Sequence, residues 1–339
     1  MNRRWICGDV WMDILPSFDH AQLGLKMALL SDRFDVLVDA HFDGKTELTI
    51  WNYIRIHKDG GPEPKLSVWI NGTFMAFPLP DHPLPNKIRF RIILIDYIDH
   101  SVIAFLRSNQ HIWDRMGTKL ELSIANIQPI WDVFVRQIWP ILTTNLRHLT
   151  FYTTEDLDNL RRHTSPTILT DLDHLNSIDS GRLCPDEIAD DGPNATAGQV
   201  LSKWLHTPSK DGQPKRLFYR YYSNPPNLKW VNNFKEAFPR ATSSASYIIR
   251  IDHAIKVYKP FELVNERTKE KLTLINEDTF YWLLKRCPIG ETVQWENDGN
   301  WDGKLNNVKF ELWRGNNSIG PLSPPSTDEE ADNSNQNVV

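Results

Sequence analysis

Three segments of alternating apolar and polar residues each precede a segment with helical periodicity, and this recurrence limits the possible folds most strongly. The alternating segments cover residues 86–92, 118–124 and 145–151, and the helical segments cover 99–109, 129–141 and 154–163. Alternation predicts a half-buried strand, whereas apolar residues at i, i+3 and i+4 predict an amphipathic helix. Strand–helix units at this spacing are typical of a solenoid of stacked units, as in leucine-rich repeats. An ordinary α/β layer gives the same pattern, and no complete Leu-x-x-Leu-x-Leu-x-x-Asn signature decides between the two.

The same periodicities continue on both sides of these units. Strands are predicted over residues 47–56, 65–70, 216–222, 246–251 and 308–313, and helices over 198–205, 228–238 and 277–285. A hairpin is predicted from residues 256–264 and 272–275 around a charged turn. The proline-dense segment 78–85 is expected to be extended and stiff, because proline fixes its own φ and restricts the residue before it.

The first 42 residues are predicted to form three short helices. Asp9, Asp19 and Ser31 are suitable capping residues for them. Apolar residues of the third helix, such as Phe34 and Val38, share one face. Three helices of this length cannot bury a core alone, so they need a further surface in this chain or in a partner.

Composition favours a folded protein of about two domains, since the chain has 339 residues. A hydrophobic content of 40% and a charged content of 24% exclude a chain that is disordered throughout. The net charge of -5 argues against a general nucleic-acid binder, which needs a basic surface. The longest apolar runs, such as 92–95 and 102–106, are far shorter than the ~20 residues of a membrane helix.

Cysteine usage and the opening residues bear on the compartment. The three cysteines lie far apart, which predicts neither a disulfide framework nor a zinc site. The opening residues lack the pattern of a secretory signal, because Asp9 and Asp13 interrupt the apolar residues after the basic pair. We therefore expect a reduced protein of the cytoplasm or the nucleus, with no membrane association.

Motifs for catalysis are missing from the sequence. Gly44-Lys45-Thr46 ends like a phosphate-binding loop, but Asp39 occupies the position of the required first glycine. Five histidines follow an aspartate directly, yet adjacent residues of a helix or strand point apart, so caps and turns are the better interpretation. The run Lys215–Tyr222 alternates basic and aromatic residues and fits either a ligand-reading strand or a solvated one. We expect no catalytic residue, metal or cofactor.

The segment from Ile6 to Val38 resembles an F-box. Ile14-Leu15 correspond to the Ile-Leu pair of that family, and Asp19 with Leu23 correspond to the start of its second helix. Leu30-Ser31-Asp32-Arg33-Phe34 corresponds to its third motif. Cys7 stands where the family usually has proline, Phe34 stands where it has tryptophan, and Pro16 within the first helix is unusual.

The rest of the chain, up to residue 313, resembles the F-box-associated region of nematode F-box proteins. The residues that carry this resemblance are Phe77–Asp81, Ile98–Ile103, Phe261–Arg267 and Trp282–Gly290. The combined expectation is an α+β chain. Residues 1–45 form a three-helix F-box, and residues 46–313 form an F-box-associated or leucine-rich-repeat-like strand–helix domain. Residues 314–339 form a disordered, acidic and Asn-rich tail.

The resemblance implies a substrate receptor of an SCF-type ubiquitin ligase that has no catalytic residues of its own. In that family the F-box binds a Skp-type adaptor, which links to cullin and RING subunits, and the second domain binds a protein substrate. The residues expected to contact the adaptor are Val10, Ile14, Leu15, Phe18, Leu23, Leu25, Leu29, Leu30, Phe34 and Val38.

Three alternatives stay open at the level of sequence. In the first, some of these apolar residues pack against residues 46–85 of the same chain instead of a partner. In the second, the whole chain is a protein-interaction module whose degenerate F-box serves only as an internal brace. In the third, the chain is an enzyme with a site that carries no recognisable motif.

Overall fold

The computed structural model describes residues 6–44, 49–70, 72–85, 88–220, 229–252, 258–277, 281–291, 305–313 and 318–323, in a mixed α+β fold. The strands are β1 (Thr49–Trp51), β2 (Ile54–His57), β3 (Lys65–Ile70), β4 (Thr73–Pro78), β5 (Ile88–Phe90), β6 (Ile93–Ile95), β7 (Thr118–Ile124), β8 (Leu146–Thr150), β9 (Ser177–Asp179), β10 (Lys215–Arg220), β11 (Tyr247–Asp252), β12 (Phe261–Asn265), β13 (Glu270–Asn276), β14 (Tyr281–Pro288) and β15 (Asn306–Leu312). The α-helices are α1 (Gly8–Ile14), α2 (His20–Gln22), α3 (Asp32–Asp43), α4 (His100–Ser108), α5 (Gln110–Met116), α6 (Gln128–Val133), α7 (Trp139–Leu142), α8 (Thr154–His163), α9 (Ile168–Asp171), α10 (Ala197–His206) and α11 (Lys229–Ala237). Helical turns of 3₁₀ or π type are η1 (Leu15–Ser17), η2 (Leu23–Met27), η3 (Ala28–Leu30), η4 (Phe134–Ile138) and η5 (Phe238–Arg240).

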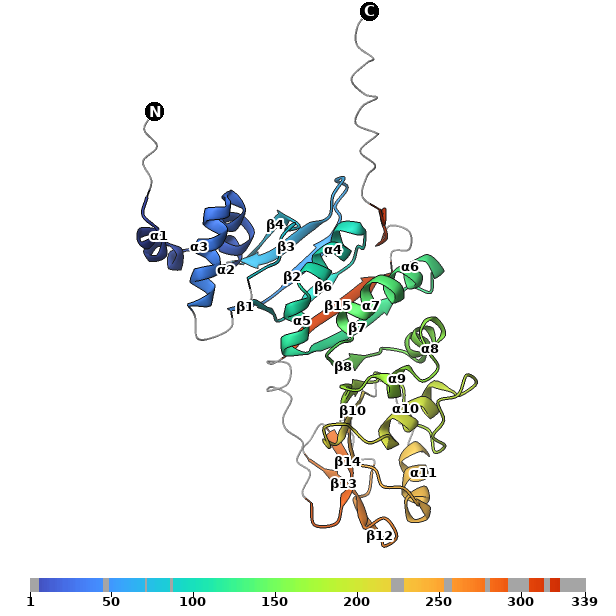
Figure 1. Ribbon diagram of the computed structural model, residues 1–339. Helices are drawn as coiled ribbons and strands as arrows, with labels where there is room; N and C mark the ends of the chain where they lie inside the picture. Colours follow the sequence, from blue (N-terminus) through green and yellow to red (C-terminus); the bar gives the residue numbers. More distant parts are fainter. Residues whose placement is uncertain are drawn as a thin grey trace, which may run out of the picture.

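One long sheet organises the molecule (Figure 1). Among the described residues its thirteen strands run in the order β12-β13-β14-β11-β10-β9-β8-β7-β15-β6-β2-β3-β4. All neighbours from β11 to β2 are parallel, whereas antiparallel hairpins extend both ends. β1 and β5 form a separate parallel pair.

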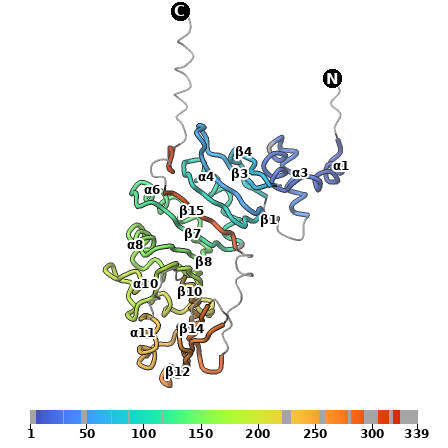
Figure 2. The backbone as a smooth tube through the Cα atoms, turned by 180° about the vertical axis from the view of Figure 1, so that it is seen from behind, coloured from blue at the N-terminus to red at the C-terminus, as the bar shows by residue number. Residues whose placement is uncertain are grey.

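The helices α4 to α11 lie along one face of this sheet, as both ribbon and tube show (Figures 1 and 2). Connections between parallel strands are right-handed. From β7 to β11 each new strand is added at the same edge of the sheet, so each connecting helix lies on the same face. The opposite face, which we call the open face, carries no described helix over its central strands. Strand–helix units in chain order are therefore confirmed from β7 to β11.

Local sequence explains several helix boundaries. α8 begins at a capping box, in which the Asp156 amide donates to Thr153 Oγ1 and the Asp156 carboxylate accepts from the Thr153 amide at 2.8 Å. Asp99 caps α4 by accepting from the Ser101 and Val102 amides, both at 3.0 Å. Asp19 caps α2 in the same way. Two of the Asp–His dipeptides are thus helix caps, as the sequence favoured.

β15 comes from the end of the described chain but lies in the middle of the sheet, between β6 and β7. It is parallel to both, with Val308 beside Ile93 on one side and beside Leu120 on the other. The strand itself was predicted, at residues 308–313. Its position was not, and it interrupts the regular succession of units.

Three predictions need correction. The predicted helix 277–285 is wrong, since β14 occupies Tyr281–Pro288. Leu283 and Leu284 are both fully buried, and burial on both faces removes the alternation that marks a strand. The predicted strands 47–56 and 86–92 are each broken: the first divides into β1 and β2, and the second gives β5 before β6 starts at Ile93.

The folded part also extends beyond residue 313. Ile319 forms a parallel bridge with Ile98, and the Ile98 amide donates to the Ser318 carbonyl at 2.9 Å. The His100 amide donates to the carbonyl of Pro321 at 3.0 Å. Residues 318–323 therefore belong to the folded part, contrary to the prediction of a disordered tail from residue 314, because backbone hydrogen bonds to Ile98 and His100 hold this segment. Residues 324–339 lie outside the described part.

Residues 6–44 are helical, but not as three uninterrupted helices. α1 passes into the turn η1 at Pro16, where proline cannot continue an α-helical ladder. α2, η2 and η3 form one continuous helical stretch, and α3 follows after Ser31. None of the helices in the described ranges is both long and apolar enough to cross a membrane.

Candidate functional site

The first candidate surface is an apolar stripe on the N-terminal helices. Ile6, Val10 and Ile14 follow one another at helical spacing and are 45%, 47% and 36% exposed. α1 itself contains no buried residue. Because exposed apolar side chains in one stripe are typical of an interaction site, this group, called the α1 stripe, is a docking candidate.

Contacts to α3 hold α1 in place. The ring centroids of Trp11 and Phe34 lie 4.8 Å apart in an edge-to-face arrangement. Arg33 donates from Nη2 to the carbonyl oxygen of Ile6. The α1 stripe is therefore presented by a helix that is fixed on one side and uncovered on the other, at one end of the molecule (Figure 1).

The ten residues predicted to bind an adaptor divide by burial. Val10, Ile14 and Leu30 are exposed, Phe18 and Phe34 are half-buried, and Leu15, Leu23, Leu25 and Val38 are buried. The side chain of Leu29 lies outside the described part. Sequence periodicity missed Ile6 and Val36, which are 45% and 67% exposed, although the i, i+4 spacing from Ile6 to Val10 was a usable signal.

The four buried residues correct the expectation that all ten side chains face a partner. Leu15, Leu23, Leu25 and Val38 are at most 1% exposed and belong to the main core. η2 lies so close to β1 that a Cβ on Gly24 would be 3.2 Å from the Trp51 ring. Periodicity shows that a helix has an apolar face, but not which surface covers it. Here strands of the same chain cover part of it.

The second candidate surface is the open face of the central strands. The strand register places one row of side chains on it: Leu94, Lys309, Glu121, Thr150, Asp179, Phe218, Arg250 and Leu283. Leu94, Thr150, Asp179 and Leu283 are buried, so the accessible part of the row lies at Lys309, Glu121, Phe218 and Arg250. Side chains alternate between faces along a strand, so the residues between them belong to the helix-covered core. The row is charged in its middle and apolar at both ends.

A lysine from β15 anchors this row. Lys309 lies 2.6 Å from Glu121 and 3.0 Å from Glu311. Burial lowers the pKa of Lys309, but the hydrogen bonds to Glu121 and Glu311 outweigh it and raise that pKa overall. The Tyr152 hydroxyl donates to Glu121, and burial first, then Glu121, raises the pKa of Tyr152 to about 12. The four groups thus form one network that keeps Lys309 charged.

A second pair lies two strands away. Arg220 contacts Asp179 at 2.7 Å, while burial raises the pKa of Asp179 against the opposing effect of Arg220. Gly181 follows β9 with φ +54°, and a Cβ there would lie 2.8 Å from the carbonyl oxygens of Phe151 and Tyr152. Only glycine allows this close approach, which brings the end of β9 beside the end of β8.

Between these pairs lies a buried histidine. His148 is 8% exposed, next to Lys119 in the register. Burial, and then the charges of Lys119 and Arg220, hold the pKa of His148 well below its ordinary value of 6.5. The open face therefore carries a buried imidazole whose protonation is disfavoured by two nearby cations.

Two hollows indent this face. One, of about 800 Å³, extends from Ile50 and Tyr53 past Arg91 to Lys309. The other, of about 380 Å³, includes Thr150, Asp179 and Arg220. Lys119 and Glu121 line both, so the hollows adjoin. Their charged lining comprises Arg89, Arg91, Lys119, Arg182, Arg220 and Lys309 against Glu121, Asp179 and Glu311. The lining is thus net positive on a chain of net charge -5.

Groups suited to covalent or metal chemistry are sparse in the described ranges. No cluster of three His, Cys, Asp or Glu side chains there is arranged to hold a metal ion. Cys7 is exposed, Cys184 is half-buried and Cys287 is buried. Burial, and then Asp186, raises the pKa of the Cys184 thiol, which disfavours the nucleophilic thiolate.

Comparison with known proteins found no match: no family model, no curated protein and no solved structure is significantly similar to this chain.

Proposed function

We propose that the chain is a non-catalytic substrate receptor, in which the α1 stripe binds a Skp-type adaptor and the open face binds a protein substrate. The adaptor would connect it to the cullin and RING subunits of an SCF-type ubiquitin ligase. The observation that carries the proposal is that α1 buries none of its residues while it exposes Val10 and Ile14. An exposed apolar stripe on a helix that is held in place by other contacts is typical of a site that a partner protein covers.

The proposed work of such a receptor is positioning. It needs two separate surfaces, one for the ligase and one for the substrate, and gains rate by raising the effective concentration of the substrate. The helices α1 to α3 lie at one end of the molecule, and the central strands β15, β7 and β8 lie farther along the sheet (Figure 1). This separation leaves room for both partners at once.

The lining of the hollows favours an acidic protein segment as the substrate. Lys309 balances only one of its two carboxylate partners, Glu121 and Glu311, so the excess positive charge of the lining comes from its other basic groups, such as Arg91. The exposed aromatic pair Trp69 and Phe74, with centroids 4.7 Å apart, lies on the neighbouring hairpin β3–β4 and offers an apolar contact. An acidic segment with a bulky apolar residue fits both features.

The adaptor contact is tested by charge insertion into the α1 stripe. Val10→Asp with Ile14→Asp removes two apolar anchors, and loss of a central anchor costs about 2 kcal/mol or more, which is on the order of thirtyfold in Kd. Val264→Asp is a matched control, because Val264 in β12 is 48% exposed and Val10 is 47% exposed. Binding of the purified chains to a Skp-type adaptor is measured by calorimetry. Equal affinity of all three chains would contradict the assignment.

The substrate surface is tested with two fluorescent peptides, one of Glu and Leu and one of Lys and Leu. The acidic peptide is expected to bind and the basic one to bind at least tenfold more weakly, because only the first complements the lining. Arg91→Glu should weaken the acidic peptide, and Lys259→Glu, an exposed lysine before β12, should leave it unchanged. Preference for the basic peptide would rule out this choice of substrate.

The burial of Leu15, Leu23, Leu25 and Val38 favours a second candidate, in which residues 6–44 only brace the end of the sheet. Lys26 of η2 also lies over the Phe77 ring of β4, 5.3 Å from its centroid. A chain that binds the acidic peptide but no adaptor would support the brace, and the receptor proposal would then be abandoned.

A further inference from the structure

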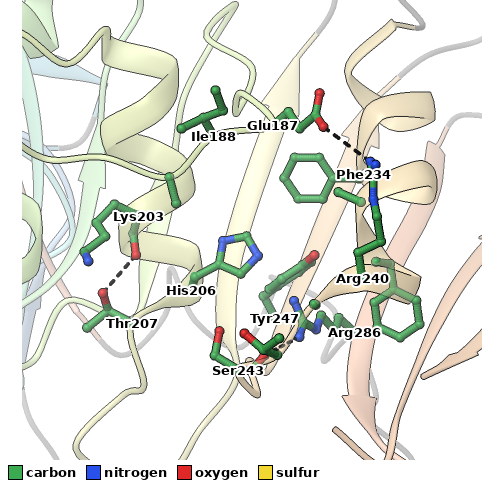
Figure 3. A pocket seen from close by; sticks show the side chains of 15 residues that line it. Glu187, Ile188, Lys203, His206, Thr207, Phe234, Arg240, Ser243, Tyr247 and Arg286 are labelled. Carbon is green, nitrogen blue, oxygen red and sulfur yellow. Dashed lines mark hydrogen bonds and ion pairs between the residues drawn. The ribbon is translucent and has the colours of Figure 1, made fainter. Parts of the chain in front are cut away.

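A cavity of about 580 Å³ lies on the helix-covered side of the sheet, away from the open face (Figure 3). α10 contributes His206, α11 contributes Phe234, η5 contributes Phe238, and β11 and β14 contribute Tyr247 and Arg286. A volume of this size is within the range of small-molecule pockets, about 300–1,000 Å³. Neither the adaptor nor the substrate surface proposed above includes any of these residues.

The walls of the cavity are aromatic. The His206 ring centroid lies 6.2 Å from that of Phe234 and 5.6 Å from that of Tyr247. Phe234 and Tyr247 are themselves 6.1 Å apart in an edge-to-face arrangement. Ile188, on the loop above His206 in Figure 3, is 66% exposed, so a ligand in the cavity would cover it.

The hydrogen bond of His206 fixes the chemistry at the centre of the cavity. Nδ1 lies 2.7 Å from the carbonyl oxygen of Ser202, and a carbonyl only accepts, so the neutral ring carries its proton on Nδ1. Nε2 is then an acceptor. No described residue donates to it, and it is not enclosed by protein atoms.

His206 stays neutral near neutral pH. Burial is the largest cause that lowers the pKa of His206, and Arg286 and Lys203 lower it further. The Ser202 carbonyl and Glu270 act in the opposite direction. The imidazole therefore presents a lone pair to the cavity rather than a second N–H.

The buried cation beside it is already satisfied. Arg286 contacts Glu270 at 2.7 Å and donates to the Ser243 carbonyl at 2.6 Å. Arg286 also lowers the pKa of the Tyr247 hydroxyl, although burial outweighs this effect and raises that pKa to about 12. At the rim, Arg240 lies 3.8 Å from Glu187. The cavity therefore disfavours an anionic ligand, because the lone pair of His206 would repel it and the charge of Arg286 is already compensated by Glu270.

We propose that this cavity binds an aromatic ring that carries an N–H or O–H donor, an indole or a phenol, with the donor directed at His206 Nε2. Phe234, Phe238 and Tyr247 then contact the ring, and the otherwise unused acceptor is satisfied. The site does not depend on the receptor function proposed above.

The test compares probes that differ in one donor. Indole is expected to bind the full-length chain about tenfold more tightly than 1-methylindole, which keeps the ring but lacks the N–H. His206→Phe should abolish this difference, and Lys203→Ala at the rim should retain it. Affinities are measured by ligand-observed NMR.

A second comparison distinguishes the source of the ring. A pentapeptide with tryptophan flanked by glycines binds as well as indole if the natural ligand is a protein side chain, and much more weakly if it is a free small molecule. Equal affinity of the wild-type chain for indole and 1-methylindole, or failure to bind both indole and phenol, would overturn the proposal, whether or not His206→Phe folds.

Discussion

Glu270 and Arg286 form the most deeply buried ion pair among the described residues, with side chains 2% and 3% exposed. Glu270 also accepts from the Ala245 amide at 2.7 Å, so it connects β13, β14 and the segment before β11. Glu270→Gln leaves Arg286 as a buried charge without its counterion. We expect it to lower the free energy of unfolding by about 3–5 kcal/mol, measured by denaturant titration.

An exposed pair provides the matched control. Glu266 and Lys269 lie 2.9 Å apart in the same hairpin, but their side chains are 78% and 73% exposed. Solvent screens such a pair, so Glu266→Gln should change the free energy of unfolding by less than about 1 kcal/mol. Equal effects of the two substitutions would show that the buried pair does not stabilise this end of the sheet.

His148 gives a prediction on pH. Because its folded pKa is held well below 6.5, the unfolded state binds a proton that the folded state does not as pH falls below 6.5. Stability is therefore retained above pH 6.5 and lost below it, with a slope from this residue of about 1.4 kcal/mol per pH unit.

His148→Gln should reduce that slope by the same amount, as measured by denaturant titration between pH 6.5 and 5. His111, His163 and His206, whose pKa values are also lowered, leave a residual slope. Above pH 7 the free energies of unfolding of the wild-type chain and of His148→Gln should change with pH in the same way. An unchanged slope below pH 6.5 would mean that His148 is protonated in the folded state.

Sequence could predict only part of each site at the level of residues. The alternation of residues 118–124 places Lys119 and Glu121 on one face of their strand, and the structure confirms it. It could not place Lys309 beside Glu121, because they are far apart in the chain and only the sheet order joins them. His206 could not be predicted as a site residue, because a lone histidine at a helix end forms no motif. Its role depends on the tautomer set by the Ser202 carbonyl.

At the level of elements, β15 is the strand on which the continuity of the sheet depends. β6 and β7 each pair with β15 and not with each other. Phe310 of β15 is fully buried, with its ring centroid 5.1 Å from that of Phe134. A chain that ends at residue 304 should therefore expose two strand edges and lose the packing between them. We expect much faster cleavage between β6 and β7 in limited proteolysis.

Adding the missing strand as a peptide should reverse this effect. A peptide of residues 305–313 can pair with both edges, so it should restore protease resistance. The same peptide with Val308→Pro lacks a backbone donor at the centre of the strand and should not. If the shortened chain is as resistant as the full chain, β15 does not hold the two parts of the sheet together.

Elements with strong local signals were the most predictable ones. The prediction of a helix over 154–163 coincides with α8, whose ends are set by its own capping box and by basic residues in its last turn. β14 shows the opposite case. Trp282, Leu283 and Leu284 are all buried, so the sequence has no polar face from which the period could be recognised.

At the scale of the whole molecule, an α+β chain with strand–helix units follows from the sequence, and the arrangement of the two ends does not. The helices of residues 6–44 pack on β1 through Trp51, which covers part of the apolar set that was expected to face a partner. The C-terminal strand returns to the centre of the sheet. Both facts depend on contacts between distant segments, for which a single sequence carries no local signal.

Amide hydrogen exchange of the full chain, with and without a Skp-type adaptor, distinguishes a docking helix from a brace. Binding should slow exchange in α1 and the turn η1 that follows it, because these carry the uncovered stripe. The strands β7 to β11 should be unaffected. Protection confined to the sheet, or no change in α1 at saturating adaptor, would contradict the proposal that this end of the molecule recruits a ligase.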